Sequence, residues 1–253
     1  LMDKNMLSIV IPAYNEATRI GNTLESIERY FAHNDMPVEV IVVDDGSTDG
    51  TAFVAGRYAS RIKNLQVLIN EKNSGKGFSV KRGMLAATGD YRLFMDADNS
   101  VDISHLDMFM RSLSNGFDVA IGSIHITDTT DVSEHNGWHR RILGSGANML
   151  VQLLAVPGIE DTQRGFKLFS AKAADAIFPR QTIERFGFDI EVLVIARKND
   201  FKIKELPVVW DNPAGSKVTA VSYFQTLGEL AHISWNRILG RYSALPTAQN
   251  EIR

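Results

Sequence analysis

The chain has 253 residues, 44% hydrophobic and 23% charged, which is the composition of an ordinary globular protein able to bury a substantial core. Its net charge of −3 argues against a nucleic-acid binder that relies on a basic surface. The lack of cysteine excludes disulfides and thiolate metal sites. Because no run of about 18 to 20 apolar residues and no signal-peptide pattern is present, we expect a cytoplasmic protein that at most touches a membrane surface.

The first half of the chain alternates strand-like runs with helical patterns. Strands are expected at residues 7–12, 38–43, 65–69, 91–95 and 117–122. Helices are expected between them, at about 16–33, 49–61, 75–88 and 103–115. This alternation predicts an α/β fold, with a mostly parallel sheet covered by helices on both faces.

The second half of the chain is less regular. A polar segment at 123–137 is interpreted as a surface loop, because apolar patterning resumes directly after it. Helices at 140–155, 189–198 and about 223–242, and a strand at 202–209, are expected beyond it. Residues 243–253 are expected to form a disordered tail.

Two of the predicted strands end in carboxylates. Asp96 and Asp98, separated by one alanine, follow the strand at 91–95, and Asp44 and Asp45 end the strand at 38–43. Open α/β sheets bind ligands at the carboxyl ends of their strands, and carboxylates are ligands for hard divalent cations. The pattern therefore indicates a nucleotide held partly through a metal.

The loops after the first three strands carry further polar groups. In residues 12–16, Tyr14 and its neighbours can stack on a nucleobase and hydrogen-bond a ribose, while Asp44 and Asp45 can accept hydrogen bonds from base N–H and ribose hydroxyl groups. Residues 47–49 are interpreted as helix caps.

The loop at residues 70–77 resembles a phosphate cradle. Its glycines permit a close approach of the backbone to a ligand, and Lys76 places a cation where a helix should begin. The sequence is not that of a Walker A loop, and a solvated turn is the alternative for this segment taken alone.

Taken together, these motifs resemble those of family 2 glycosyltransferases, which have the nucleotide-sugar-binding GT-A fold. The matching segments are 10–16, 42–51, 73–77 and 96–98. In the second half, residues 161–169, 184–191 and 210–217 are similar to dolichyl-phosphate β-glucosyltransferases and, more broadly, to polyprenyl-phosphate hexosyltransferases. The resemblance implies one GT-A domain over 1–242, with a nucleotide-sugar half at 6–122 and an acceptor half at 123–242 that ends in an amphipathic helix.

The resemblance also implies roles for single residues of the first half. The nucleoside is expected to contact Pro12, Tyr14, Glu16, Asp44 and Lys76. Asp96 is expected to contact both the nucleotide and a Mg²⁺ or Mn²⁺ ion, which Asp98 also binds. Ser100 stands where some mannosyl relatives carry a glutamine ligand, so the resemblance leaves the third metal ligand open.

In the acceptor half, the resemblance implies that Arg140 binds the acceptor phosphate with Arg141 as its partner. Ser216 and Lys217 are expected to reach the donor or the acceptor phosphate, and Gln163 is expected to bind substrate. Asp161 is either the catalytic base or a group that orients the sugar or the arginines. Two carboxylates of the helix at 189–198 are interpreted as partners of sugar hydroxyls or of cations: Asp189 and Glu191.

The function implied is inverting transfer of a hexose, with glucose from UDP-glucose favoured, to a polyprenyl or dolichyl phosphate at the cytoplasmic face of a membrane. The last helix and the 123–137 loop are the candidate membrane contacts. A GDP-mannose donor, a carbohydrate-hydroxyl acceptor and a catalytically silent nucleotide-sugar-binding protein remain alternatives. A haloacid-dehalogenase-type phosphatase is disfavoured, because that class carries its aspartates after the first strand.

Overall fold

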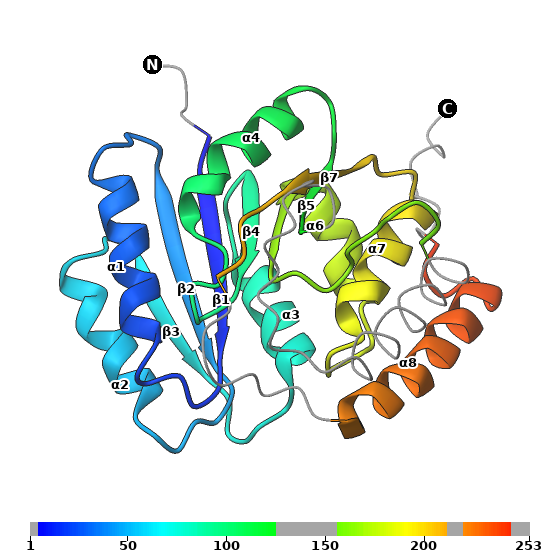
Figure 1. The fold of residues 1–253 in the computed structure, drawn as a ribbon, viewed down its shortest axis with the longest axis horizontal. Helices are drawn as coiled ribbons and strands as arrows, with labels where there is room; N and C mark the ends of the chain where they lie inside the picture. The colour runs from blue at the N-terminus through cyan, green and yellow to red at the C-terminus, as the bar shows by residue number, and fades with distance from the viewer. Residues whose placement is uncertain (1–4, 125–155, 212–219, 244–253) are drawn as a thin grey trace, which may run out of the picture.

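The fold is described from a computed structural model over residues 5–124, 156–211 and 220–243, the side chains of 220–227 excepted. Within these residues seven strands form one sheet, in the order β3-β2-β1-β4-β6-β5-β7 (Figure 1). In chain order the strands are β1 (Leu7–Ala13), β2 (Val38–Asp44), β3 (Leu65–Ile69), β4 (Tyr91–Met95), β5 (Val119–Ser123), β6 (Phe166–Ser170) and β7 (Ile203–Pro207).

The sheet is mixed but mostly parallel, as the sequence predicts. Strands β1 to β4 run parallel to one another, and β7 runs parallel to β5. Strand β6, which the sequence analysis did not identify, lies between β4 and β5 and is antiparallel to both. The second half of the chain thus adds two strands to the sheet begun by the first half.

Helices cover both faces of this sheet. They are α1 (Ile20–Phe31), α2 (Thr51–Gly56), α3 (Lys76–Ala86), α4 (Leu106–Ser114), α6 (Ala171–Ile177), α7 (Phe188–Lys198) and α8 (Ala220–Ile238), with 3-10 turns η1 (Arg57–Ser60), η2 (Ile103–His105) and η3 (Phe178–Arg180). Helix α6 was not predicted, and the helix predicted at 140–155 lies outside the described residues.

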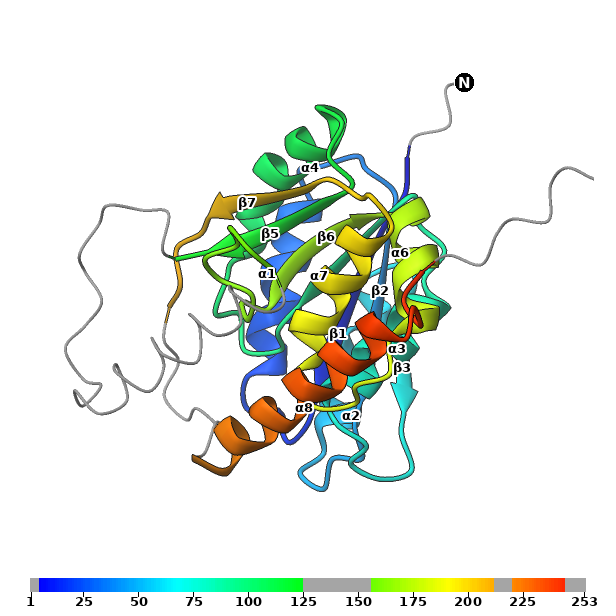
Figure 2. The same cartoon turned by 90° about the vertical axis from the view of Figure 1, so that its right-hand side faces the viewer.

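The two faces have separate apolar cores because successive side chains of a strand point to opposite sides. Leu7, Ile9 and Ile11 of β1 belong to the core that includes residues of α1, α2 and α4, whereas Val10 belongs to the core that includes residues of α3, α6, α7 and α8. Figure 2 shows α3, α6, α7 and α8 in front of the sheet and α1 behind it. Helix α1 buries Ile20, Leu24 and Ile27, which a spacing of four and three residues places on one side of the helix.

The carboxyl ends of β1, β2, β3 and β4 lie at one edge of the sheet. Pro12 lies in the part of β1 that has only one neighbouring strand. β1 pairs with β4 over Leu7–Val10 only, but it pairs with β2 as far as Ala13. A proline, which has no N–H to donate, is tolerated where the strand has a single neighbour. The loops that leave this edge carry the polar motifs.

Candidate active site

An ion pair between Lys76 and Asp96 lies at the carboxyl edge of the sheet. Lys76 is the first residue of α3, and its Nζ lies 2.7 Å from Asp96 Oδ1, just past β4. Asp98 follows two residues later, and its Oδ1 accepts a hydrogen bond of 3.1 Å from the backbone N–H of Ser100. The carboxylates of Asp96 and Asp98 each remain 25% exposed, so both are accessible to a ligand.

Lys76 keeps its positive charge in this setting. Burial favours the neutral amine, but the carboxylates of Asp96 and Asp189 outweigh that effect and raise the pKa of Lys76 above its ordinary value. The ammonium also lies 5.2 Å from the centre of the Phe94 ring, a further favourable contact for a cation. Gly75, which precedes Lys76, has φ +113, a conformation that side chains rarely adopt.

The carboxylate of Asp96 lies directly against Gly165. A Cβ atom on Gly165 would lie 1.9 Å from Asp96 Oδ2, and the carbonyl of Gly165 accepts a hydrogen bond of 3.0 Å from the backbone N–H of Asp96. The missing side chain at this position therefore makes the space that the carboxylate occupies.

A second ion pair is buried beneath the first. Lys167 of β6 pairs with Asp189 of α7, and the two side chains are only 1% and 3% exposed. The Lys167 ammonium also donates to the carbonyl of Arg164 at 2.6 Å, and it lies 5.6 Å from the centre of the Phe94 ring. Of the two partners predicted for Asp189, a sugar hydroxyl or a cation, the structure shows a cation, the lysine Lys167, and the predicted contact of Asp189 with substrate stays a prediction.

Residues 12–16 are fixed by the loop after β2. The backbone N–H groups of Asn15, Glu16 and Ala17 donate to the side chains of Ser47, Thr51 and Asp49, at 2.8 to 3.0 Å. The predicted capping role of 47–49 is confirmed for Asp49 alone: its Oδ1 accepts a hydrogen bond of 3.1 Å from the N–H of Thr51, the first residue of α2, across the intervening Gly50. The Ser47 hydroxyl and the other Asp49 carboxylate oxygen satisfy backbone donors of the neighbouring loop.

The two aspartates at the end of β2 also have protein partners. Asp45 accepts hydrogen bonds from the backbone N–H groups of Ser74 and Gly75 and from the Asn70 amide, at 2.7 to 2.9 Å. Asp44 accepts one of 2.9 Å from the N–H of Ser47. Both side chains are buried. Asp45 thus holds the loop that places Lys76, and the predicted nucleoside contacts of Asp44 and Asp45 stay predictions.

Asp161 is held by a neighbouring arginine. Its Oδ2 accepts a hydrogen bond of 2.7 Å from Arg164 Nε, and its Oδ1 accepts one of 3.3 Å from the N–H of Gln163. The Arg164 guanidinium stacks on the Trp210 ring at 4.7 Å. The carboxylate is buried and paired with a cation, and the choice between a base and an orienting group stays a prediction.

Glu191 is fully buried on the first turn of α7. Its carboxylate accepts hydrogen bonds from the N–H and hydroxyl of Thr182, from the N–H of Ile183 and from the hydroxyl of Tyr242, at 2.6 to 2.9 Å. These contacts tie α7 to residues 182–183 and to Tyr242 in the turn that follows α8. The predicted contact of Glu191 with substrate stays a prediction.

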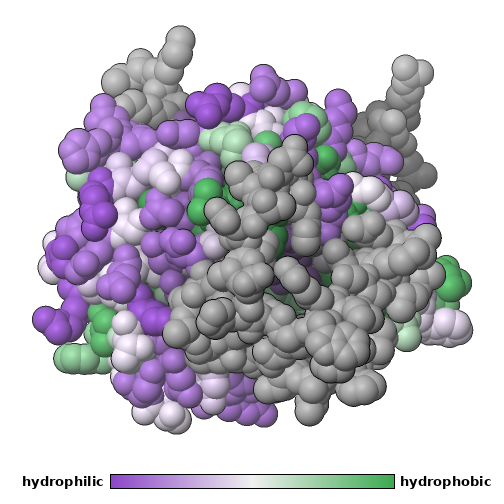
Figure 3. Space-filling model, viewed as in Figure 1, coloured by the Kyte–Doolittle hydropathy of each residue, from purple (hydrophilic) through white to green (hydrophobic). Residues whose placement is uncertain are grey.

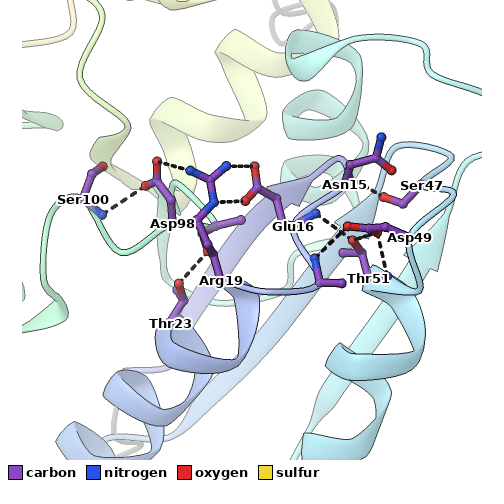
Figure 4. A network of polar contacts seen from close by, with 11 residues as sticks. Asn15, Glu16, Arg19, Thr23, Ser47, Asp49, Thr51, Asp98 and Ser100 are labelled. Atoms are coloured by element: carbon purple, nitrogen blue, oxygen red, sulfur yellow. Dashed lines mark hydrogen bonds and ion pairs between the residues drawn. The ribbon is translucent and has the colours of Figure 1, made fainter. Parts of the chain in front are cut away.

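Arg19 joins the first loop to the acidic motif, and the sequence analysis missed it. Its guanidinium forms two hydrogen bonds to Glu16, of 2.6 and 2.7 Å, and its Nη1 lies 4.0 Å from Asp98 Oδ2 (Figure 4). Tyr14 of the same loop is 38% exposed, so its ring is accessible. Four predicted site residues lie outside the described residues: Arg140, Arg141, Ser216 and Lys217.

Asp102 fixes the loop that follows Asp98. Its carboxylate accepts hydrogen bonds from the N–H of Ser104 at 2.9 Å and from the hydroxyl of Ser26 at 2.7 Å. Burial alone raises the pKa of this carboxyl, but these bonds and one from Asn99 outweigh it and lower the pKa of Asp102 to about 2. The charged form is therefore the stabilised one.

We expect Asp102→Asn to lower the free energy of unfolding by about 1 kcal/mol at pH 7. A folded-state pKa of about 2, below the ordinary 3.8, means that the stabilisation is present above pH 4 and is lost as the pH falls to 2. Urea unfolding of both proteins between pH 2 and 7 should show the difference disappear over that window. A difference that does not change with pH would assign the loss to geometry instead of charge.

The exposed carboxylates have the chemistry of a divalent-metal site. Asp96 and Asp98 offer hard oxygen ligands of the kind that Mg²⁺ and Mn²⁺ bind. Among the described residues, no group of three or more His, Cys, Asp and Glu side chains is placed to hold a metal. Two carboxylates fit a metal that takes its other ligands from water and from a phosphate-bearing substrate.

The chain is similar in sequence to known proteins over most of its length. A model of the family described as Glycosyl transferase family 2 matches residues 8–178. The dolichyl-phosphate beta-glucosyltransferase of Dictyostelium discoideum is 35% identical over 252 residues, which cover 94% of this chain and 77% of the relative. The enzyme of the same name from Homo sapiens is 33% identical over 93% of this chain and 77% of its own length.

Solved structures share the fold at lower sequence identity. Mannosyl-3-phosphoglycerate synthase from Rubrobacter xylanophilus matches with a TM-score of 0.69 at 16% identity, over 98% of this chain and 78% of the other. Glucosyl-3-phosphoglycerate synthase from Mycobacterium tuberculosis, in complex with Mn²⁺, UDP and glucosyl-3-phosphoglycerate, matches with a TM-score of 0.64 at 19% identity, over 96% and 82%. The predicted GT-A architecture is confirmed by these matches.

Proposed function

The chain belongs to glycosyl transferase family 2, and on that premise we propose that it transfers glucose from UDP-glucose to dolichyl phosphate or a related polyprenyl phosphate. The observation that carries the proposal is the convergence of Lys76, Asp96 and Asp98 at the carboxyl edge of the sheet. The choice of substrates is supported by relatives similar over more than 90% of the chain, which are named dolichyl-phosphate beta-glucosyltransferases.

The charged groups at the sheet edge suit departure of a nucleoside diphosphate. Asp96 and Asp98 would hold the Mg²⁺ or Mn²⁺ ion, which when bound neutralises charge on the leaving diphosphate. Lys76 stays protonated and supplies a fixed cation beside it. Tyr14, Glu16 and the rest of the first loop would then hold the nucleoside.

A phosphate acceptor removes the need for a strong base. The second pKa of a phosphomonoester is near 6, so the acceptor oxygen is already ionised at pH 7. The Asp161 carboxylate accepts a hydrogen bond of 2.7 Å from Arg164 Nε. We therefore assign Asp161 the role of orienting the sugar or the arginines. Direct attack by the phosphate oxygen on the anomeric carbon, with departure of UDP from the opposite face, converts an α-linked donor into a β-linked product.

Residues outside the described part of the chain complete the proposal. Arg140 and Arg141 would bind the acceptor phosphate, and Ser216 and Lys217 would contact the donor or acceptor phosphate. Gln163 is exposed beside Asp161 and is available to a substrate. We propose that the nucleotide-sugar half ends near residue 122 and that the remaining segments form the acceptor half.

A lipid acceptor requires the protein to approach a membrane. Within the described residues no helix is long and apolar enough to cross one. The end of α8 nevertheless presents apolar side chains to solvent: Trp235 is 60% exposed and Ile238 76%, with Leu239 and two arginines, Arg237 and Arg241, beside them. Figure 3 shows hydrophobic residues at the right-hand edge, over this end of α8. An apolar surface with adjacent cations suits peripheral contact with anionic lipid.

We expect glucose transfer from UDP-glucose to dolichyl phosphate presented in liposomes that contain anionic lipid, when Mn²⁺ or Mg²⁺ is present. Asp98→Asn, which keeps the size of the side chain but removes its charge, should lower transfer at least about a hundredfold. Product formation is measured by the transfer of labelled sugar, and pelleting of the same liposomes measures membrane binding. GDP-mannose and a soluble sugar acceptor are tested in parallel, and transfer only with one of them would overturn the choice of substrates.

A further inference from the structure

Arg19 occupies a position that no motif of the sequence marks. It lies on a segment after β1, yet its guanidinium contacts Glu16 of the nucleoside loop and approaches Asp98 of the acidic motif (Figure 4). Glu16 is bound through Nε and Nη2, and Nη1 is turned towards Asp98 at 4.0 Å. A distance of 4.0 Å between Nη1 and the Asp98 carboxylate is too long for a hydrogen bond, but it is short enough for a strong interaction between the two charges.

The local backbone does not favour a cation at this position. Arg19 immediately precedes α1, and the N-terminus of a helix carries a partial positive charge. The side chain is also only 22% exposed. The guanidinium is therefore retained there by the neighbouring carboxylates, and its charge is part of the electrostatics of the acidic motif.

Arg19 changes the net charge around the acidic motif, and that charge determines whether the site attracts a diphosphate. The ion pairs described at this edge contain four carboxylates, of Glu16, Asp96, Asp98 and Asp189, against the three cations Arg19, Lys76 and Lys167. Among the described residues these seven groups sum to −1, and a divalent metal brings the sum to +1. Removal of Arg19 lowers the positive charge by one unit and with it the attraction for a diphosphate.

We propose that Arg19 is a binding residue of the donor site, a third cation for the donor's diphosphate that acts with the metal and Lys76. The inference rests on the proposed function for the identity of the diphosphate, UDP. It has a consequence that a simple structural clamp does not share. A fixed cation 4.0 Å from Asp98 opposes the binding of a metal ion and favours the binding of the diphosphate, so its removal should move the two affinities in opposite directions.

The test is calorimetry with Mn²⁺ alone and with UDP in saturating Mn²⁺, on the wild type and on Arg19→Gln. We expect Arg19→Gln to bind Mn²⁺ several-fold more tightly than the wild type and to bind UDP about tenfold more weakly, whereas weaker UDP binding with unchanged Mn²⁺ binding would reduce Arg19 to a clamp for Glu16. Arg19→Lys, which retains the charge, should recover part of the UDP affinity. Arg61→Gln is the matched control, because Arg61 forms a similar two-bond pair with Glu28 on the surface, and it should change neither affinity.

The outcomes separate this inference from the proposed function. Weaker binding of both ligands to Arg19→Gln would reduce Arg19 to a clamp for Glu16 and Asp98, and unchanged binding of both would remove it from the site. A wild type that binds neither UDP nor Mn²⁺ would overturn the inference together with the donor assignment. If the wild type binds both ligands with the expected response to substitution but transfers no glucose to dolichyl phosphate, the proposed function fails and the role of Arg19 stands.

Discussion

Gly165→Ala is expected to lower sugar transfer by about a hundredfold while the protein stays folded. A Cβ atom at this position would lie 1.9 Å from Oδ2 and 2.1 Å from Cγ of Asp96. The atoms that must move belong to the end of a side chain that remains 25% exposed, so the carboxylate can turn away without displacing the backbone. The loss therefore falls on metal binding and on the Lys76 pair instead of on the fold.

The matched control for Gly165→Ala is a second glycine-to-alanine change, at Gly56. Gly56 ends α2 with φ −59, and a Cβ there meets nothing within 4 Å. Gly56→Ala should keep full activity and raise the free energy of unfolding by about 0.4 to 1 kcal/mol, because alanine restricts the unfolded chain. Transfer kinetics, Mn²⁺ calorimetry and thermal unfolding are measured on both variants. Wild-type Mn²⁺ affinity and activity in Gly165→Ala would show that the Asp96 carboxylate does not serve the reaction.

The first four strands were predictable because their residues are nearly all apolar and each run ends at polar residues. The predicted bounds of β3 and β4, 65–69 and 91–95, are those observed. Strand β6, which has five residues as β3 and β4 do, was not predicted; its second residue, Lys167, is a charged residue that the sheet buries. A buried lysine is tolerated only with a partner, and that partner, Asp189, belongs to a distant helix.

The candidate site was predictable only where one segment carries the whole signal. Asp96 and Asp98 are separated by a single alanine at a strand end, so their common position at the sheet edge followed from the pattern. From the sequence alone, Arg19 is an ordinary surface residue near the start of a helix. No residue close to it in the sequence indicates that Asp98 lies 4.0 Å away in the fold. The cations that pair with the carboxylates come from different strands and helices, and only the folded topology brings them together.

Removal of the buried cation beneath the site gives the largest expected effect on stability. Lys167→Met preserves most of the side-chain volume but leaves Asp189 without its partner, and we expect the free energy of unfolding to fall by about 3 to 5 kcal/mol. Burial raises the pKa of Asp189, so the variant can take up a proton at low pH. A folded-state pKa above the unfolded one gives stability that is lost as the pH rises, so the defect should be smaller at pH 5 than at pH 8.

The double variant Lys167→Met/Asp189→Asn separates charge from packing. Without the buried carboxylate it should regain about half or more of the lost free energy of unfolding and lose the added pH dependence. Arg61→Met, which breaks the exposed pair with Glu28, is the control and should change stability little, because solvent screens that pair. Urea unfolding at several pH values measures all four proteins. A double variant as unstable as Lys167→Met at every pH would assign the loss to packing of the lysine's aliphatic stem against Phe94 and its neighbours rather than to the stranded charge of Asp189.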